Sequence, residues 1–337
     1  MKSAWVVPAA VGVVSLLSFS CEESFSPKTK FQGRNVLFCI IETDLIHTTD
    51  VTATVSRLYD VDGPDPSVNK VDPAVVGATV TLTINNGVSD RVYLLTESSR
   101  PRADTSRYAK CQRFYSVKGI SVHYYDRYLR MTAHLPGGDS LVATTTVPHH
   151  ALKEGFPPYP RGVTTRLDPL KYGKAWIIDW DDSFDEQHLF FPKLVIYWKK
   201  VAGPTGVAAQ GVKEVPLQYV KRGDQMVPIY PSYSERESCS YDFAAIDSAM
   251  AQISAGDPNK GDYIVSSIVF RYTEFDSHLS RYYSSVNGSL DQYSVRVDET
   301  VSTNVVGGLG IFGSCYSETW GLPLEPGYVK SFGYRAK

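Results

Sequence analysis

An excess of charge of either sign is missing from this 337-residue sequence, which holds 34 Lys and Arg against 36 Asp and Glu, a formal net charge of -2. Without a basic field the chain has no global attraction for polyanions, so we expect no nucleic-acid partner. The hydrophobic share of 43% and the charged share of 21% are those of an ordinary folded protein. These values argue against a membrane bundle and against a disordered chain.

Recognisable catalytic motifs are also missing. The sequence has no GxSxG nucleophile elbow, no HExxH zinc helix and no GxxxxGKS or GxxxxGKT phosphate loop. An enzyme is therefore the less favoured interpretation, and we predict no catalytic residue and no cofactor.

The candidate metal ligands have unsuitable spacing. Five acids lie close together, namely Asp179, Asp181, Asp182, Asp185 and Glu186. An EF-hand loop counted from Asp179 needs Gly where Phe184 stands, so a solvated acidic loop is favoured over calcium binding. His149 and His150 are adjacent, and adjacent side chains point apart in an extended chain. We predict no metal site.

The N-terminus has the features of a targeting segment. Residues 4–19 form an apolar run after Lys2, in the order of a secretory signal and too short to cross about 30 Å of hydrocarbon comfortably. The run ends at Ser18-Phe19-Ser20-Cys21, which resembles the lipobox of bacterial lipoproteins. That resemblance implies a signal peptide at residues 1–20, lipidation of Cys21 and a tether at residues 21–34. Several acyl chains would anchor the chain stably in a membrane, and ordinary secretion with cleavage nearby is the alternative.

Alternating apolar and polar residues predict two β-rich domains. In the first, at residues 35–148, strands are expected at 36–41, 51–56, 79–84, 91–96, 128–133 and 141–147. About six or seven short strands suit an immunoglobulin-like β-sandwich. Pro157-Pro158 lies in the expected connection between the domains.

The second domain, at residues 149–337, is predicted to be β-rich with two short helices. Its strands are expected at 174–180, 194–200, 218–220, 264–272 and 328–334. Apolar residues at helical spacing predict one helix over 243–253 and another over 275–286. The overall fold class is mainly β.

Four cysteines remain after Cys21, an even number in a chain that we expect to be exported. Three pairings are open, and one of them keeps each disulfide within one predicted domain, namely Cys39 with Cys111 and Cys239 with Cys315. Four buried free thiols are the alternative.

A glycine-rich run near the end matches the expression GxGxxG at Gly308, Gly310 and Gly313. Only a short segment follows Gly313, with neither a crossover helix nor a ribose-binding acid, so dinucleotide binding is not predicted. Close strand packing or bulges better explain the glycines.

Three segments together resemble a Bacteroidetes-type lipoprotein family, catalogued as domain of unknown function 4249. They are residues 77–82 (GATVTL), Tyr282-Tyr283 and residues 304–313 (NVVGGLGIFG), and the last is the most specific. It contributes the family-motif residues Asn304, Gly307, Gly308, Gly310, Phe312 and Gly313. Glu22 and Glu23 resemble the acidic surface-export signal of such lipoproteins.

The resemblance implies an outward-facing lipoprotein of the outer membrane that assists a TonB-dependent nutrient transporter. We therefore expect a non-enzymatic accessory or ligand-binding protein, anchored to the membrane by lipid. An envelope hydrolase of glycans or peptides, and a structural or adhesive surface protein, are the alternatives.

Overall fold

Hydrogen bonding between strands organises most of the chain. The computed structural model describes residues 33–44, 47–58, 72–102, 111–123, 125–148, 174–179, 188–202, 206–235, 238–287 and 302–337. Residues 34–337 group into one unit, in which 13 strands join one hydrogen-bonded sheet and two further pairs stand apart. The mainly β class predicted from the sequence is confirmed.

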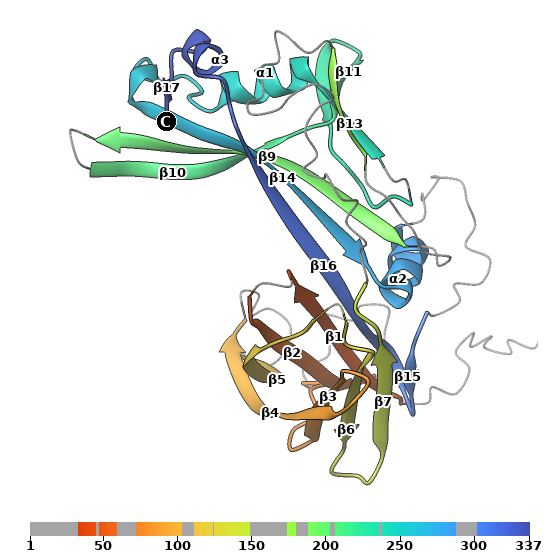
Figure 1. The fold of residues 1–337 in the computed structure, drawn as a ribbon. Helices are drawn as coiled ribbons and strands as arrows, with labels where there is room; N and C mark the ends of the chain where they lie inside the picture. The colour runs from red at the N-terminus through yellow and green to blue at the C-terminus, as the bar shows by residue number, and fades with distance from the viewer. Residues whose placement is uncertain are drawn as a thin grey trace, which may run out of the picture. The chain divides into compact units, whose positions relative to one another are not determined.

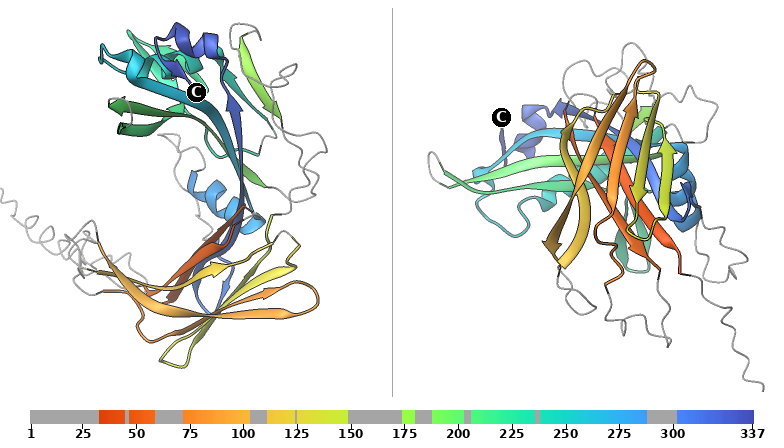
Figure 2. Two further views of the ribbon diagram at one scale, coloured as in Figure 1. Left: turned by 60° about the vertical axis from the view of Figure 1, so that its left-hand side comes forward. Right: turned by 90° about the horizontal axis from the view of Figure 1, so that it is seen from below.

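The N-terminal strands form two layers that share one core. They are β1 (Asn35–Thr43), β2 (Thr49–Arg57), β3 (Thr79–Asn85), β4 (Asp90–Pro101), β5 (Cys111–Ile120), β6 (Tyr128–His134) and β7 (Ser140–Thr145). The order β1-β2-β5-β4 makes one layer and β4-β3-β6-β7 the other. Strand β4 belongs to both, because residues 90–95 pair with β3 and residues 96–101 with β5. Figure 2 shows β4 (orange) curving between them.

Inward-facing side chains confirm the alternation predicted for these strands. Val80, Leu82 and Ile84 of β3 are fully buried, and they join Leu37 and Cys39 of β1 in one hydrophobic cluster. The intervening Thr residues of β3 point to the other face, where they are exposed or half-buried. Because the side-chain period of a strand is two residues, this burial fixes the register of each strand.

Residues from the far end of the chain complete the N-terminal core. Strand β15 (Val305–Val306) pairs with β7, and the first half of β16 (Leu309–Pro323) runs parallel to β1. Val305 and Phe312 consequently pack in the N-terminal cluster. The second half of β16 pairs with another strand, β14 (Tyr263–Phe275), so one strand serves both halves of the fold, as Figure 1 shows.

The C-terminal half combines strand β14 with a hairpin and short elements. Its other strands are β8 (Ala175–Asp179), β9 (Leu189–Ala202), β10 (Gly206–Val215), β11 (Gln218–Arg222), β12 (Gln225–Ile229), β13 (Ser238–Asp242) and β17 (Arg335–Ala336). The helices are α1 (Phe243–Gln252), α2 (Ser277–Asn287) and α3 (Pro326–Ser331). Both predicted helices, over 243–253 and 275–286, are confirmed as α1 and α2.

Helices α1 and α3 cover one face of the sheet that contains β9 and β14. Ile246 and Met250 of α1 and Val329 of α3 pack in a second cluster with Leu194 and Ile196 of β9, all almost completely buried. The residues of β9 that alternate with these two point to the opposite face, and one of them, Tyr197, is 45% exposed. That opposite face carries the candidate site described below.

One predicted strand of the C-terminal half is wrong. Residues 328–334 were expected to be extended because they are rich in aromatic residues, but α3 occupies 326–331. Pro326 stands at the first position of this helix, where its fixed φ favours helix, and Gly333 adopts a φ of 85° just after the end. These local signals outweigh strand propensity.

A buried carboxylate joins three elements where the two halves meet. Asp276 precedes α2 and is 1% exposed. Its Oδ1 accepts a hydrogen bond from Leu279 N at 2.7 Å, which is the geometry of a helix N-cap. Its Oδ2 accepts from the Thr145 hydroxyl of β7 and, at 2.5 Å, from Ser314 N of β16. Burial raises the pKa of Asp276, and these three hydrogen bonds oppose that rise.

Several predictions fall outside the described residues or are not tested by them. Residues 1–32, with Cys21, Glu22 and Glu23, lie outside, as does the expected connection at 149–173. The division at residue 148 stays a prediction; one hydrophobic cluster lies before it and two lie after it, except that Val305 and Phe312 join the N-terminal one. The immunoglobulin-like label also stays a prediction. No helix in the described ranges is long and apolar enough to cross a membrane.

Candidate functional site

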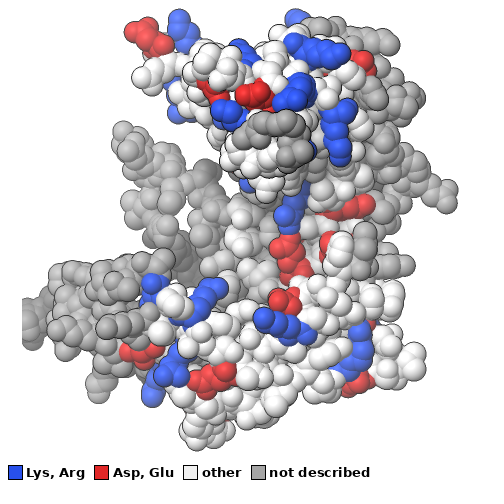
Figure 3. Space-filling view, turned by 90° about the vertical axis from the view of Figure 1, so that its left-hand side faces the viewer, with Lys and Arg blue, Asp and Glu red and all other residues white. Residues whose placement is uncertain are grey.

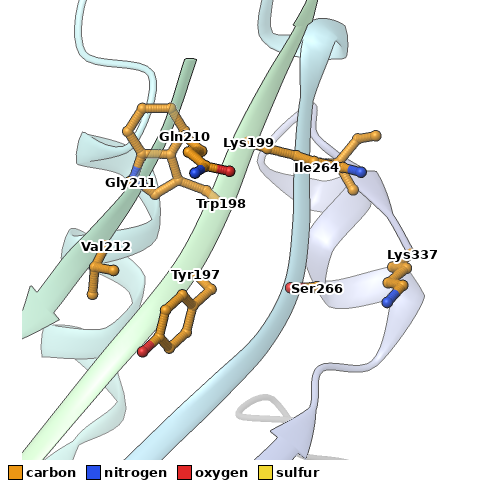
Figure 4. Close-up of a pocket in the computed structure, with 9 residues that line it drawn as sticks. All are labelled: Tyr197, Trp198, Lys199, Gln210, Gly211, Val212, Ile264, Ser266 and Lys337. Atoms are coloured by element: carbon orange, nitrogen blue, oxygen red, sulfur yellow. The ribbon is translucent and has the colours of Figure 1, made fainter. Parts of the chain in front are cut away.

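The uncovered face of the β10-β9-β14 sheet carries a pocket of about 550 Å³, here called the sheet pocket. It is lined by Tyr197, Trp198, Lys199, Gln210, Gly211, Val212, Ile264, Ser266 and Lys337 (Figure 4). The volume lies within the range of small-molecule sites, which is about 300–1,000 Å³. The pocket is open to solvent on one side.

Strand register brings these residues together from four places in the sequence. Lys199 of β9 lies opposite Gln210 of β10 and Ile264 of β14, and Tyr197 lies opposite Val212. Strand β17 pairs in parallel with β14 and carries Lys337 directly after its end. Bulges interrupt β10 at residues 207–209 and β14 at residues 265–267, and a bulge increases the local twist of a strand.

Gly211 is required by its neighbour Trp198. The two residues are directly opposite in the β9-β10 ladder, and a Cβ added at Gly211 would lie 2.7 Å from Cζ2 of the indole. The absence of a side chain therefore lets the indole lie against the backbone of β10. The ring of Trp198 also packs against that of Tyr263 on β14, with ring centroids 5.7 Å apart.

An ion pair joins Lys200 of β9, the residue after Lys199, to Asp257 in the segment between α1 and β14. Lys200 Nζ lies 2.5 Å from Asp257 Oδ2, and the Tyr263 hydroxyl donates to the same oxygen at 2.9 Å. Hydrogen bonds from Lys200, from the backbone N–H of Asn259 and from Tyr263 lower the pKa of Asp257 to about 2. In turn, the hydrogen bond with Asp257 raises the pKa of Lys200. The Lys200 charge is thus neutralised locally.

A second pocket, of about 520 Å³, is more polar. It lies beside β8, β11 and β13, and its lining includes Gln218, Tyr233, Cys239, Asp242 and four serines, at 232, 234, 238 and 240. Residues 236–237, between two of these serines, lie outside the described residues. The sheet pocket, whose lining segments are all described without a gap, is therefore the stronger candidate site.

The glycine-rich motif has a packing function, as the sequence predicted. A Cβ at Gly307 would overlap with Ser140 O, one at Gly308 with Asn35 O and one at Gly310 with Leu37 O. At Gly313 a Cβ would overlap with the side chain of Leu279 on α2. The motif lies against the backbone of β1 and β7 and against a side chain of α2, at distances that only glycine permits.

Asn304 and Phe312 complete this motif through a pair of hydrogen bonds. Asn304 Nδ2 donates to Phe312 O at 2.6 Å, and Phe312 N donates to Asn304 Oδ1 at 2.9 Å. The side-chain amide thereby replaces a backbone partner in the ladder. The Tyr282-Tyr283 segment of the family resemblance also contributes to packing, because the ring of Tyr283 stacks on that of Tyr233 with ring centroids 4.6 Å apart.

No disulfide joins any two of the four described cysteines, so neither predicted disulfide is formed in this structure. Cys39 is fully buried on β1, whereas Cys111 is exposed on β5, with β2 between the two strands. Two strand spacings of about 4.8 Å separate these strands, which exceeds the Cα distance of about 7 Å that a disulfide can bridge. Cys239 and Cys315 belong to different hydrophobic clusters. The alternative of buried free thiols fits Cys39 and Cys315 only.

The candidate metal ligands are not assembled in the described residues. No group of three or more His, Cys, Asp or Glu side chains there could hold a metal ion. Asp181, Asp182, Asp185, Glu186, His149 and His150 all lie outside the described residues. A buried pair does exist: His188 Nδ1 lies 2.7 Å from Glu274 Oε1, with both side chains less than 10% exposed. It ties the start of β9 to β14.

Sequence reasoning did not identify the sheet pocket. Strand 194–200 was predicted, and its alternation of Tyr197 and Lys199 with Ile196 and Trp198 was a signal for an open face. Lys337 carried no such signal, because the parallel pairing of β17 with β14 joins positions far apart in the sequence.

Comparison of the chain with protein-family models, with curated proteins and with solved structures finds no match. The resemblance to the lipoprotein family stays a prediction.

Proposed function

We propose that this protein is a lipid-anchored, outward-facing outer membrane protein that binds a ligand as the non-enzymatic accessory of a TonB-dependent nutrient transporter. The observation that carries the binding role is the sheet pocket, an open cavity on a sheet face that no described helix covers. Concave sites of this volume with a few convergent polar groups are the usual form of small-molecule sites.

The cellular location rests on the N-terminal sequence. Cys21 follows an apolar segment and precedes Glu22 and Glu23, the order expected of an exported lipoprotein. Acyl chains on Cys21 would hold the chain at the membrane surface, while the fold over residues 34–337 forms a separate unit.

Affinity recovery from the native membrane tests the transporter partner. A C-terminally tagged full-length chain, expressed in its own cells, is extracted in mild detergent, and the retained proteins are identified by mass spectrometry. We expect reproducible recovery of a TonB-dependent transporter. Recovery of the chain alone, under conditions that preserve known transporter complexes, would contradict the accessory role and direct attention to hydrolytic or adhesive activity.

A pair of cysteine variants tests the anchor. Cys21→Ser should remove the lipid-modified N-terminal peptide from the mass spectrum and release the chain from the membrane fraction. Cys111→Ser changes an exposed cysteine elsewhere and should leave both unchanged. Membrane retention of the Cys21→Ser variant without lipid would show that the anchor has another origin.

A further inference from the structure

The electrostatic character of the sheet pocket differs from that of the whole chain. Two of its lining residues, Lys199 and Lys337, are cationic, and its lining contains no Asp or Glu. Neither lysine forms an ion pair within the described part of the chain. The net charge of -2 therefore gives no measure of the charge of the lining side chains, which is positive.

Two acidic side chains of the neighbouring elements are engaged by other lysines. Glu214 of β10 lies 2.9 Å from Lys193, and Asp257 is held by Lys200. Figure 3 shows Lys and Arg side chains interspersed with Asp and Glu over the upper, C-terminal elements. An anion in the pocket would meet the ammonium groups of Lys199 and Lys337 and no Asp or Glu side chain of the lining.

Uncharged groups around the two lysines favour a ring that carries hydroxyls. Tyr197 offers an exposed aromatic ring, and Val212, 53% exposed, adds apolar surface next to it. Gln210 supplies an amide and Ser266 a hydroxyl, which together can donate and accept hydrogen bonds. In Figure 4 the lysines and Ser266 lie toward one end and Tyr197 and Val212 toward the other. A fatty acid would leave much of its tail in water, because the pocket is open.

We propose that the sheet pocket binds a saccharide that carries an anionic substituent, with the anion at Lys199 and Lys337 and a sugar ring against Tyr197. The shared chemistry is a negatively charged group on a hydroxylated ring, and its source is a uronate carboxylate or a sugar sulfate. The proposal deepens the ligand-binding part of the proposed function and rests on it.

Calorimetric titration of the full-length chain in detergent tests this with trigalacturonate, with its methyl ester and with a sulfated disaccharide. The acid should bind, and the ester, which differs only by loss of charge, should bind at least tenfold more weakly. Binding of the sulfated disaccharide in addition would assign the site to anionic sugars in general, and its failure would restrict the site to uronates. Raising the salt concentration to about 0.5 M should weaken the binding of the acid, because exposed charges are screened.

Matched lysine variants locate the site. Lys199→Ala and Lys337→Ala should each weaken trigalacturonate binding about fivefold, as expected for a partly exposed charge contact. Lys221→Ala removes an exposed lysine of β11 outside the pocket and should bind as the unmodified chain does. Tyr197→Ala should weaken the binding of the ester as well as that of the acid, since the ring contact does not depend on charge.

Three results would overturn the proposal: equal binding of the acid and the ester, no binding of either anionic probe at 10 mM (about 10⁴-fold above micromolar affinity), or equal effects of the Lys199 and Lys221 variants. Transporter recovery is measured separately in the native membrane. Recovery of the transporter without sugar binding would refute the ligand class alone, whereas sugar binding without a transporter would refute the accessory role alone.

Discussion

Substitution of Asp276 is the most direct test of how the two halves are joined. In Asp276→Ala three donors lose their acceptor, namely Leu279 N, Ser314 N and the Thr145 hydroxyl. The hydroxyl can turn to another acceptor, but the two backbone N–H groups cannot. A buried unpaired donor costs about 1–3 kcal/mol. Removal of a buried carboxylate offsets part of this cost, which leaves an expected loss of about 3–4 kcal/mol.

Asp276→Asn gives an intermediate result because one acceptor oxygen remains. An amide oxygen can occupy either the Oδ1 or the Oδ2 position, so one backbone N–H, that of Leu279 or of Ser314, faces an NH₂ group. We expect a loss of about 1–3 kcal/mol. Asp50→Asn is the control, because Asp50 is exposed and accepts one hydrogen bond from Gly119 N, and it should change stability by less than about 0.5 kcal/mol.

The pH dependence provides an independent check on the same residue. Because burial raises the pKa of Asp276 in the folded state, folding takes up a proton, and the carboxyl contributes most stability below its unfolded pKa of about 3.9. That contribution is lost as the pH rises through the folded pKa. The deficit of Asp276→Asn should therefore be larger at pH 4 than at pH 7.

Urea unfolding followed by circular dichroism measures these differences as shifts of the midpoint at constant m. The reasoning is refuted if Asp276→Ala and Asp50→Asn are equally stable. A deficit of Asp276→Asn that shrinks on acidification would show that the hydrogen bonds outweigh burial in setting the pKa.

Three further predictions concern the glycine motif, the Lys200–Asp257 ion pair and the thiols. Gly310→Ala should destabilise the fold by about 3 kcal/mol or more in urea unfolding, since φ is 117° and a Cβ would meet backbone, whereas Gly137→Ala, with open space around it, should change little. Lys200→Met should raise the pKa of Asp257 from about 2 toward about 3.9 in a carbon-13 NMR titration. The stability that this carboxylate provides is present above about pH 3.9 and lost toward pH 2, so the free energy of unfolding of the variant should fall less on acidification. An unchanged pKa of Asp257 would contradict the pairing. Without reductant, Cys111 should react rapidly with a thiol reagent and the buried cysteines only after unfolding. If no cysteine reacts even in denaturant, the disulfides predicted from the sequence would be supported instead.

Elements with a clear local period were predictable, and elements that depend on distant partners were not. Strand β3 alternates strictly and α1 has helical spacing, so both were predicted close to their observed bounds. Strand β16 was not predicted, because Gly310 and Gly313 interrupt its pattern and its first partner, β1, begins at Asn35. Strand β10 was missed as well, since its Gly- and Ala-rich start has low strand propensity and depends on pairing with β9.

The candidate site was less predictable than the fold. Packing roles for the motif glycines could be inferred, because a GxGxxG without a following helix has no use in dinucleotide binding. The sheet pocket could not, because Lys199 and Lys337 meet only through the register of β9, β14 and β17. Register between distant strands follows from the whole core and is not encoded in a local pattern.

The shared strand β16 has a consequence for the order of folding. Its pairing with β1 joins Val36 to Leu309, so the N-terminal core lacks Val305 and Phe312 until nearly the entire chain has been made. Contacts of such sequence separation form slowly, because the entropy of closing the intervening loop is lost before they stabilise the product. During synthesis, β1 would therefore keep an unpaired edge. A chain that crosses a membrane before folding avoids this intermediate, and a chain truncated before residue 305 should accumulate it and aggregate.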